Sequence, residues 1–207
     1  MYTCRSAVTS LVLLAAVISV AGCRVDMEKN DLGAYGNVKV ATPFGKIQIK
    51  TNDTAVVHGL GLPVYPGADL QQNQGNNDGT ADVDMSFGNF RLRVQTASFK
   101  SSDSPDKVSA FYLKVLGRYG DVVKCQNGRS VGTLSQAPEG LTCDTEWDAH
   151  ISGDNSDRIE LKVGSRKHQH IVAINPDAST TKMQIVAVDL PEHIALADSQ
   201  DGDAHKQ

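Results

Sequence analysis

Residues 81–94 alternate strictly between apolar and polar side chains, and this pattern constrains the fold more than any other stretch. The apolar positions are Ala81, Val83, Met85, Phe87, Phe90, Leu92 and Val94. A two-residue Gly88-Asn89 step interrupts the alternation, and glycine first in such a loop favours a type II′ β-hairpin. In that register Asp84 lies opposite Arg93, which indicates a cross-strand charge pair rather than a catalytic dyad. The apolar face of this hairpin needs a cover.

A helix is predicted over residues 105–119. Ser104 is the expected N-cap, with Pro105 at the first helical position and Gly120 as the stop signal. Apolar residues follow at helical spacing, namely Val108, Phe111, Tyr112, Val115, Leu116 and Tyr119. We expect this amphipathic helix to cover the apolar face of the 81–94 hairpin.

Further alternating segments predict more strands. Residues 37–51 indicate a hairpin around a Pro43-Phe44 turn, residues 122–125 a strand, and residues 159–190 an antiparallel meander with a turn at 175–177. The predicted fold class is therefore α+β: an antiparallel β-sheet of about five to seven strands with one main amphipathic helix packed on one face, preceded by a β-hairpin.

The N-terminal stretch predicts a secretory signal. A segment with Arg5 precedes an apolar run over 7–20, which is too short to span a bilayer as a helix. Residues 20–23 (VAGC) resemble the bacterial lipobox, in which the thiol receives diacylglycerol before cleavage on its N-terminal side. The resemblance implies that Cys23 is the lipidation site and that residues 1–22 are a lipoprotein signal peptide. The alternative is an ordinary secreted protein that is cut elsewhere.

Lipidation of Cys23 would place the protein in the bacterial cell envelope, with the membrane as its partner through the N-terminal lipid. Arg24 stands where an Asp would favour retention at the inner membrane, so the resemblance favours the outer membrane, facing the periplasm. The mature chain then divides into a tether over 23–36, a single α+β domain over 37–190 and a disordered acidic tail over 191–207. Within the domain, 37–51 is the hairpin and 60–190 is the sheet plus helix.

Charge and cysteine count narrow the function further. The tail carries most of the formal charge of −4, so the body is nearly neutral and offers no electrostatic case for nucleic-acid binding. Cys4 leaves with the leader and Cys23 is acylated, which leaves Cys125 and Cys143. In an oxidising compartment these two should form a disulfide. The rival interpretation, a redox or metal-binding thiol pair, lacks the C-x-x-C spacing.

His168 and His170 are the candidate metal ligands. Two residues apart on a strand, they share one face, and a third ligand such as His150 would complete a site. Arg166 and Lys167 beside them would repel a cation, which favours solvated strand-edge histidines. The chain has no G-x-S-x-G, P-loop or H-E-x-x-H motif. We therefore expect no enzyme activity and no cofactor, with a metal-assisted envelope enzyme using His168 and His170 as an alternative.

Several phrases between residues 60 and 190 resemble a domain that recurs in uncharacterised bacterial envelope lipoproteins. They are residues 62–68 (LPVYPGA), Phe99, residues 103–108 (DSPDKV), Phe111-Tyr112 and Leu116. Asp121 replaces the tryptophan usual after the helix, so Trp147 would have to supply that aromatic packing. The resemblance implies a fold and brings no activity.

These observations predict a lipid-anchored envelope protein that serves as a noncatalytic binding or structural module, with its protein or envelope-polymer partner unidentified. The 37–51 hairpin is also similar to single rungs of bacterial adhesin-like proteins. An adhesin-like surface component is therefore a further alternative, although the unit occurs once.

Overall fold

The computed structural model describes residues 23–29, 35–51, 54–71, 79–132, 134–143 and 157–191. The predicted signal peptide 1–22 lies outside these ranges, as does the predicted tail after Pro191. Residues 144–156, with Trp147 and His150, also lie outside the described residues.

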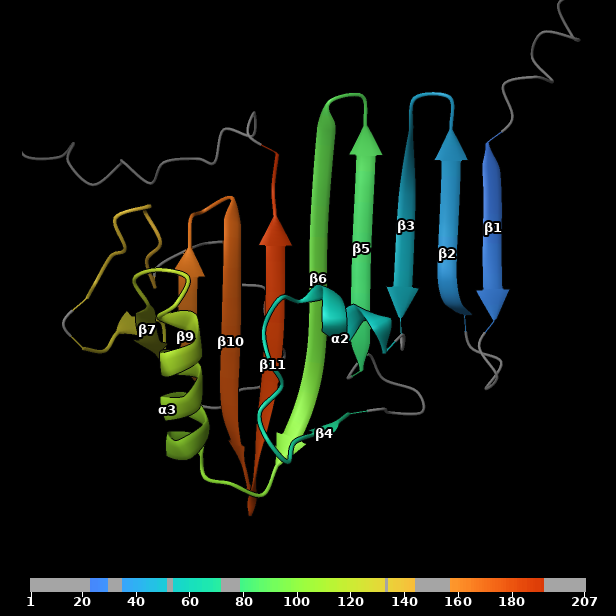
Figure 1. Ribbon diagram of the computed structural model, residues 1–207. Helices are drawn as coiled ribbons and strands as arrows, with labels where there is room; N and C mark the ends of the chain where they lie inside the picture. Colours follow the sequence, from blue (N-terminus) through green and yellow to red (C-terminus); the bar gives the residue numbers. More distant parts are fainter. Residues whose placement is uncertain are drawn as a thin grey trace, which may run out of the picture.

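Within these described ranges, eleven strands form one antiparallel sheet (Figure 1). In chain order they are β1 (Arg24–Lys29), β2 (Tyr35–Thr42), β3 (Gly45–Thr51), β4 (Asp69–Leu70), β5 (Thr80–Phe87), β6 (Phe90–Ser101), β7 (Val123–Gln126), β8 (Arg129–Ser130), β9 (Ile159–Gly164), β10 (His168–Asp177) and β11 (Thr180–Asp189). Across the sheet the order is β1-β2-β3-β5-β6-β11-β10-β9-β7-β8, and β4 adds to β6. The last meander therefore inserts between β6 and β7.

The predicted α+β class, with one main helix on a smaller sheet, is wrong. The described residues are mainly antiparallel strand, and they contain two helices, α2 (Ala55–Gly59) and α3 (Pro105–Leu116). The helix α3 begins at Pro105 as predicted but ends at Leu116, because the chain turns at Gly117 rather than at Gly120. It lies over β9 and β10 instead of the 81–94 hairpin (Figure 1).

Residues 23–36, predicted as a tether, contain the edge strand β1. Val25 pairs with Val40, and Met27 pairs with Val38. The short alternation of RVDMEK is sufficient for a strand because a neighbouring hairpin supplies the hydrogen-bonding edge. The folded sheet therefore begins one residue after Cys23.

The predicted hairpins have the expected registers. Met85 pairs with Leu92 and Val83 with Val94, while Gly88 has φ +57°, as the first residue of a type II′ turn requires. The 37–51 hairpin is β2 and β3. The 159–190 meander is β9 to β11, although β10 continues through Pro176, so its turn lies at residues 178–179 rather than 175–177.

The two faces of the sheet have different covers. We call the side that carries α2 and α3 the helix face, and the side that carries residues 134–143 the disulfide face. Strand β6 serves both: Leu92 and Val94 point to the disulfide face, and Ala97 and Phe99 point to the helix face. The apolar alternation therefore changes phase between Val94 and Ala97.

The main core lies on the helix face. Buried side chains of α3, including Val108, Tyr112 and Leu116, pack with strand residues such as Leu161 and Val172. A smaller core on the disulfide face contains Val123, Cys125, Ala137, Leu141 and Cys143.

The N-terminal strands form a single layer. On the disulfide face they carry aligned aliphatic residues, in rows that run through Val25, Val40, Ile47, Met85 and Leu92. Val25 is 49% exposed and the next row begins with Met27 at 58%. Within the described ranges, nothing packs closely on this part of the sheet.

Candidate functional site

Cys23 is exposed and forms no disulfide. It directly precedes β1, and Arg24 pairs with Ala41 of β2. The predicted lipidation site thus lies at the corner of the sheet, next to a folded strand. Among the described residues, no helix is both long and apolar enough to cross a bilayer.

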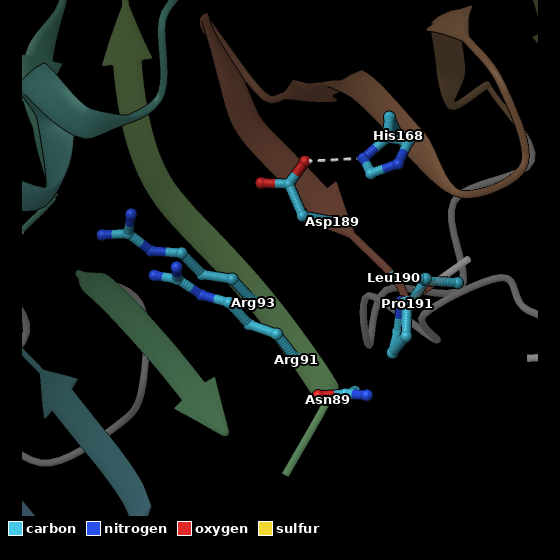
Figure 2. Close-up of a pocket in the computed structure, with 7 residues that line it drawn as sticks. All are labelled: Asn89, Arg91, Arg93, His168, Asp189, Leu190 and Pro191. Carbon is cyan, nitrogen blue, oxygen red and sulfur yellow. Dashed lines mark hydrogen bonds and ion pairs between the residues drawn. The ribbon is translucent and has the colours of Figure 1, made fainter. Parts of the chain in front are cut away.

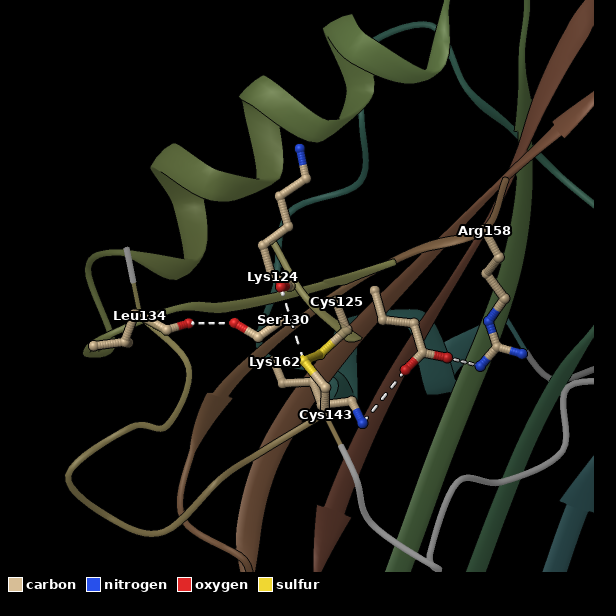
Figure 3. The surroundings of a disulfide bond; sticks show 8 residues. Lys124, Cys125, Ser130, Leu134, Cys143, Arg158 and Lys162 are labelled. Atoms are coloured by element: carbon tan, nitrogen blue, oxygen red, sulfur yellow. Dashed lines mark hydrogen bonds and ion pairs between the residues drawn. A yellow bond between two sulfur atoms is a disulfide. The ribbon is translucent and has the colours of Figure 1, made fainter. Parts of the chain in front are cut away.

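The predicted disulfide between Cys125 and Cys143 is confirmed (Figure 3). Cys125 lies on β7 and the two Cα atoms are 5.6 Å apart. The bond fixes residues 134–143 against the disulfide face, where Ser130 also donates a hydrogen bond to the Leu134 carbonyl at 3.0 Å. Both cysteines are buried and belong to the small core of the disulfide face, which indicates a structural role for the bond.

A buried ionic group adjoins this disulfide. The Lys162 ammonium is 3.4 Å from a Glu160 carboxylate oxygen, and Arg158 pairs with the other oxygen (Figure 3). Glu160 and Lys162 are neighbours of Cys125 and Val123 in the ladder. Each buried charge thus faces an opposite one, as burial requires.

His168 and His170 both lie on the helix face of β10, as the two-residue spacing predicts. Their rings contact different partners. His168 Nδ1 is 3.1 Å from Asp189 Oδ1, whereas His170 Nε2 is 3.1 Å from the carbonyl oxygen of Leu60. In the part of the chain that the structure describes, no group of three or more His, Cys, Asp or Glu side chains could hold a metal ion. His150, the suggested third ligand, lies outside it.

An open cleft of about 490 Å³ lies on the helix face at the start of β6 (Figure 2). Its lining residues are Asn89, Arg91, Arg93, His168, Asp189, Leu190 and Pro191. No pattern in the sequence indicates this cleft, because β6 and β11 become neighbours only in the folded sheet.

The two arginines of the cleft are already paired. Arg93 makes two contacts with Asp82, at 3.1 and 2.8 Å, and the hydrogen bond to this carboxylate raises the pKa of Arg93. Arg91 lies 3.2 Å from Asp84. The predicted Asp84–Arg93 register is correct, but the ion pairs run diagonally. These pairs hold the two guanidinium groups in place beside the cleft.

The residues that carry the lipoprotein-domain resemblance hold a loop against α3. The Tyr112 hydroxyl accepts a hydrogen bond from the Tyr65 amide at 3.1 Å and donates to the Pro63 carbonyl at 3.3 Å. The Tyr65 hydroxyl donates to Asp103 at 2.8 Å. Burial raises the pKa of Tyr112, and the bond to Asp103 raises that of Tyr65.

Asp103 also accepts a hydrogen bond from Lys107 at 2.9 Å. The hydrogen bonds from Lys107 and then Tyr65 lower the pKa of Asp103. All these groups connect the 62–68 loop to the helix, which indicates a structural role for the motif.

Comparison of the chain with protein-family models, with curated proteins and with solved structures finds no match. The function must therefore be argued from the residues and their arrangement.

Proposed function

We propose that the protein is a lipid-anchored component of the bacterial cell envelope, held at the membrane through Cys23, and that it acts as a noncatalytic binding or structural module. The observation that carries this proposal is the position of Cys23. It ends the VAGC phrase, its thiol is exposed and free, and it precedes the first strand directly.

The use of the reactive side chains supports a noncatalytic role. Cys125 and Cys143 are bonded to each other. His168 and His170 contact Asp189 and the Leu60 carbonyl. Tyr112, whose pKa is raised by burial, would not ionise near neutral pH. Each group has a partner that explains its presence without a reaction.

The expected location is the outer membrane, with the domain in the periplasm, because Arg24 follows the acylated position. A periplasmic location agrees with a disulfide, which persists in oxidising compartments. Close attachment follows as well, since β1 starts at Arg24 and leaves no long spacer between lipid and sheet.

Membrane fractionation of the wild-type chain and of Cys23→Ser tests the anchor. In a bacterial host the wild type should sediment with membranes, and its N-terminal peptide should carry diacylglycerol by mass spectrometry. Cys23→Ser should be soluble or remain unprocessed. Cys4→Ser is the matched control, because this cysteine precedes the proposed cleavage site and its loss should change nothing. Normal cleavage and membrane attachment of Cys23→Ser would refute the proposal.

A further inference from the structure

Three segments of the chain meet at one end of the sheet. The start of β1, the β2–β3 turn and the β5–β6 turn all lie at this end (Figure 1). We call it the anchor end. Its residues are Cys23, Phe44, Phe87 and Phe90, together with the basic residues Arg24, Lys46 and Arg91. The register aligns Thr42 with Gly45, Gly45 with Phe87, and Phe87 with Phe90. Because Arg24 pairs with Ala41, Cys23 lies beside Thr42 at the start of the same line.

The anchor end carries exposed aromatic side chains. Phe44, at the tip of the β2–β3 turn, is 83% exposed, and Phe87, beside the β5–β6 turn, is 40% exposed. Phe44 belongs to neither buried core, and the ring of Phe87 lies over Gly45 of the neighbouring strand with much of its surface still exposed. Exposed aromatic rings on two adjacent hairpins indicate contact with something apolar outside the domain.

The anchor end also carries a row of basic side chains on paired strands. This row lies one register position further into the sheet than the line from Thr42 to Phe90. Arg24 pairs with Ala41, Ala41 with Lys46, Lys46 with Ser86 and Ser86 with Arg91. Three cations thus share the helix face at this end. The side chains of Arg24 and Arg91 are 80% and 68% exposed, although each also contacts an aspartate of the next row.

The acidic partners lie further from the anchor end. In the row behind the basic one, Asp26 and Asp84 are balanced by Lys39 and Arg93, and the row after that holds Glu28 and Asp82 with Lys50. The basic row holds no acidic residue, so net positive charge is concentrated at the end that carries Cys23. The cleft lined by Arg91, Arg93, His168 and Asp189 opens beside it, which adds polar surface next to the aromatic side chains.

This combination fits a membrane surface better than a second copy of the chain. Phenylalanine is among the side chains that interfacial segments bury at the boundary between headgroups and acyl chains, and lysine and arginine are attracted to anionic headgroups. A second copy docking by the same end would bring two basic rows together. Lipid chains on Cys23 would also bring the bilayer to this end.

We infer that the anchor end is a membrane-docking surface for anionic phospholipid bilayers. Phe44 and Phe87 insert into the interface, and Arg24, Lys46 and Arg91 face the phospholipid headgroups. The strands then meet the membrane end-on, and the β10–β11 turn points away from it. The inference rests on the proposed lipidation of Cys23.

The test uses the lipidated protein in vesicles of phosphatidylethanolamine and phosphatidylglycerol. A fluorophore sensitive to polarity is attached at Asn89→Cys, in the β5–β6 turn, or at Ser179→Cys, in the opposite β10–β11 turn. We expect a blue shift and quenching by lipid-borne nitroxide for the label at 89, and neither effect for the label at 179. Adding Phe44→Ser and Phe87→Ser should abolish the difference while the protein still floats with the vesicles.

Each other outcome overturns the inference in a distinguishable way. A protein that does not float with vesicles refutes the lipid anchor and, with it, the docking. A protein that floats, with both labels equally exposed to aqueous iodide, refutes the docking alone. A blue shift at 89 that depends on protein density and resists lipid-borne nitroxide would assign this end to self-association instead.

Discussion

Replacing Tyr112 with Phe tests the connection between the 62–68 loop and α3. The ring is fully buried, so Phe fills the same space and the change removes the hydroxyl alone. The Tyr65 amide then loses its hydrogen-bond acceptor and the Pro63 carbonyl its donor. An unsatisfied buried group costs about 1–3 kcal/mol, so we expect a loss of about 2 kcal/mol. For a chain of this size that lowers the melting temperature by about 4–8 °C.

Tyr119→Phe is the matched control. Its hydroxyl donates to the Gly61 carbonyl at 2.7 Å, but the residue is 51% exposed and water can replace the lost bond. The expected cost is below about 0.5 kcal/mol. Thermal unfolding followed by circular dichroism measures both variants. Equal melting temperatures for Tyr112→Phe and Tyr119→Phe would refute the reasoning.

The pH dependence of the stability of wild type and of Tyr112→Phe provides a second test. The pKa of Tyr112 is raised in the folded protein, while the unfolded value is about 10. The hydroxyl therefore contributes stability that is complete below about pH 10 and is lost as the pH rises toward the folded pKa. The stability gap between wild type and Tyr112→Phe should narrow above that pH. A gap that stays constant would show that the hydroxyl is not buried.

Three further changes test other parts of the fold. Replacing Cys125 and Cys143 with Ala opens a loop with a sequence separation of 18 and should lower the free energy of unfolding in urea by about 3 kcal/mol; a loss below about 1 kcal/mol would contradict the entropic argument. Because hydrogen bonds from Lys107 and Tyr65 lower the pKa of Asp103, its charge stabilises the fold above the unfolded pKa of about 3.9, and this stability is lost as the pH falls through the folded pKa. Asp103→Asn should therefore be less stable than wild type at pH 6 and equal to it at strongly acidic pH, and a deficit that persists there would argue against the ion pair. Gly164→Ala, at φ +102°, places a Cβ 2.3 Å from the His168 carbonyl oxygen and should prevent the β9–β10 turn from closing. Gly128→Ala, at φ +71° with open space around it, should lower the free energy of unfolding by about 1 kcal/mol. Similar melting temperatures for the two variants would contradict the steric argument.

Local elements with two agreeing signals were predictable from the sequence. The β5–β6 hairpin has both strict alternation and a Gly88-Asn89 turn, and its register is correct. The start of α3 has Pro105 at the first position together with helical spacing. Short segments with weak signals were not predictable: β1 lies in the stretch predicted as a tether, and no element was predicted where the five-residue α2 lies.

The cover of the hairpin could not be predicted from the alternation. Alternation shows which residues of a strand share a face, but not which face of the sheet a distant helix will meet. In β6 the alternation changes phase after Val94, so its first half belongs to the disulfide face and its second half, with Phe99, to the core under α3. The helix was therefore assigned to the wrong apolar surface.

The candidate site was also predictable only in part. The Cys125–Cys143 disulfide was predictable without geometry, because these two cysteines remain once Cys4 is assigned to the leader and Cys23 to the lipid. The cleft and the anchor end depend on register across several strands. Lys46 and Arg91 are 45 positions apart in the chain, and Ser86, which pairs with both, brings them to one end of the sheet.

The insertion of β11 beside β6 has a consequence for the order of folding. Their pairing joins Ser101 to Thr181 and Arg93 to Asp189, separations of 80 and 96 residues. By contrast, the strands from β1 to β6 pair with nearer neighbours in sequence, so they can assemble before the C-terminal strands join the sheet. The centre of the sheet has to wait for the last strand, and long-range pairings of this kind fold slowly. Until β11 pairs with it, the second half of β6 is thus an unpaired edge at which the partly folded chain is most prone to aggregate.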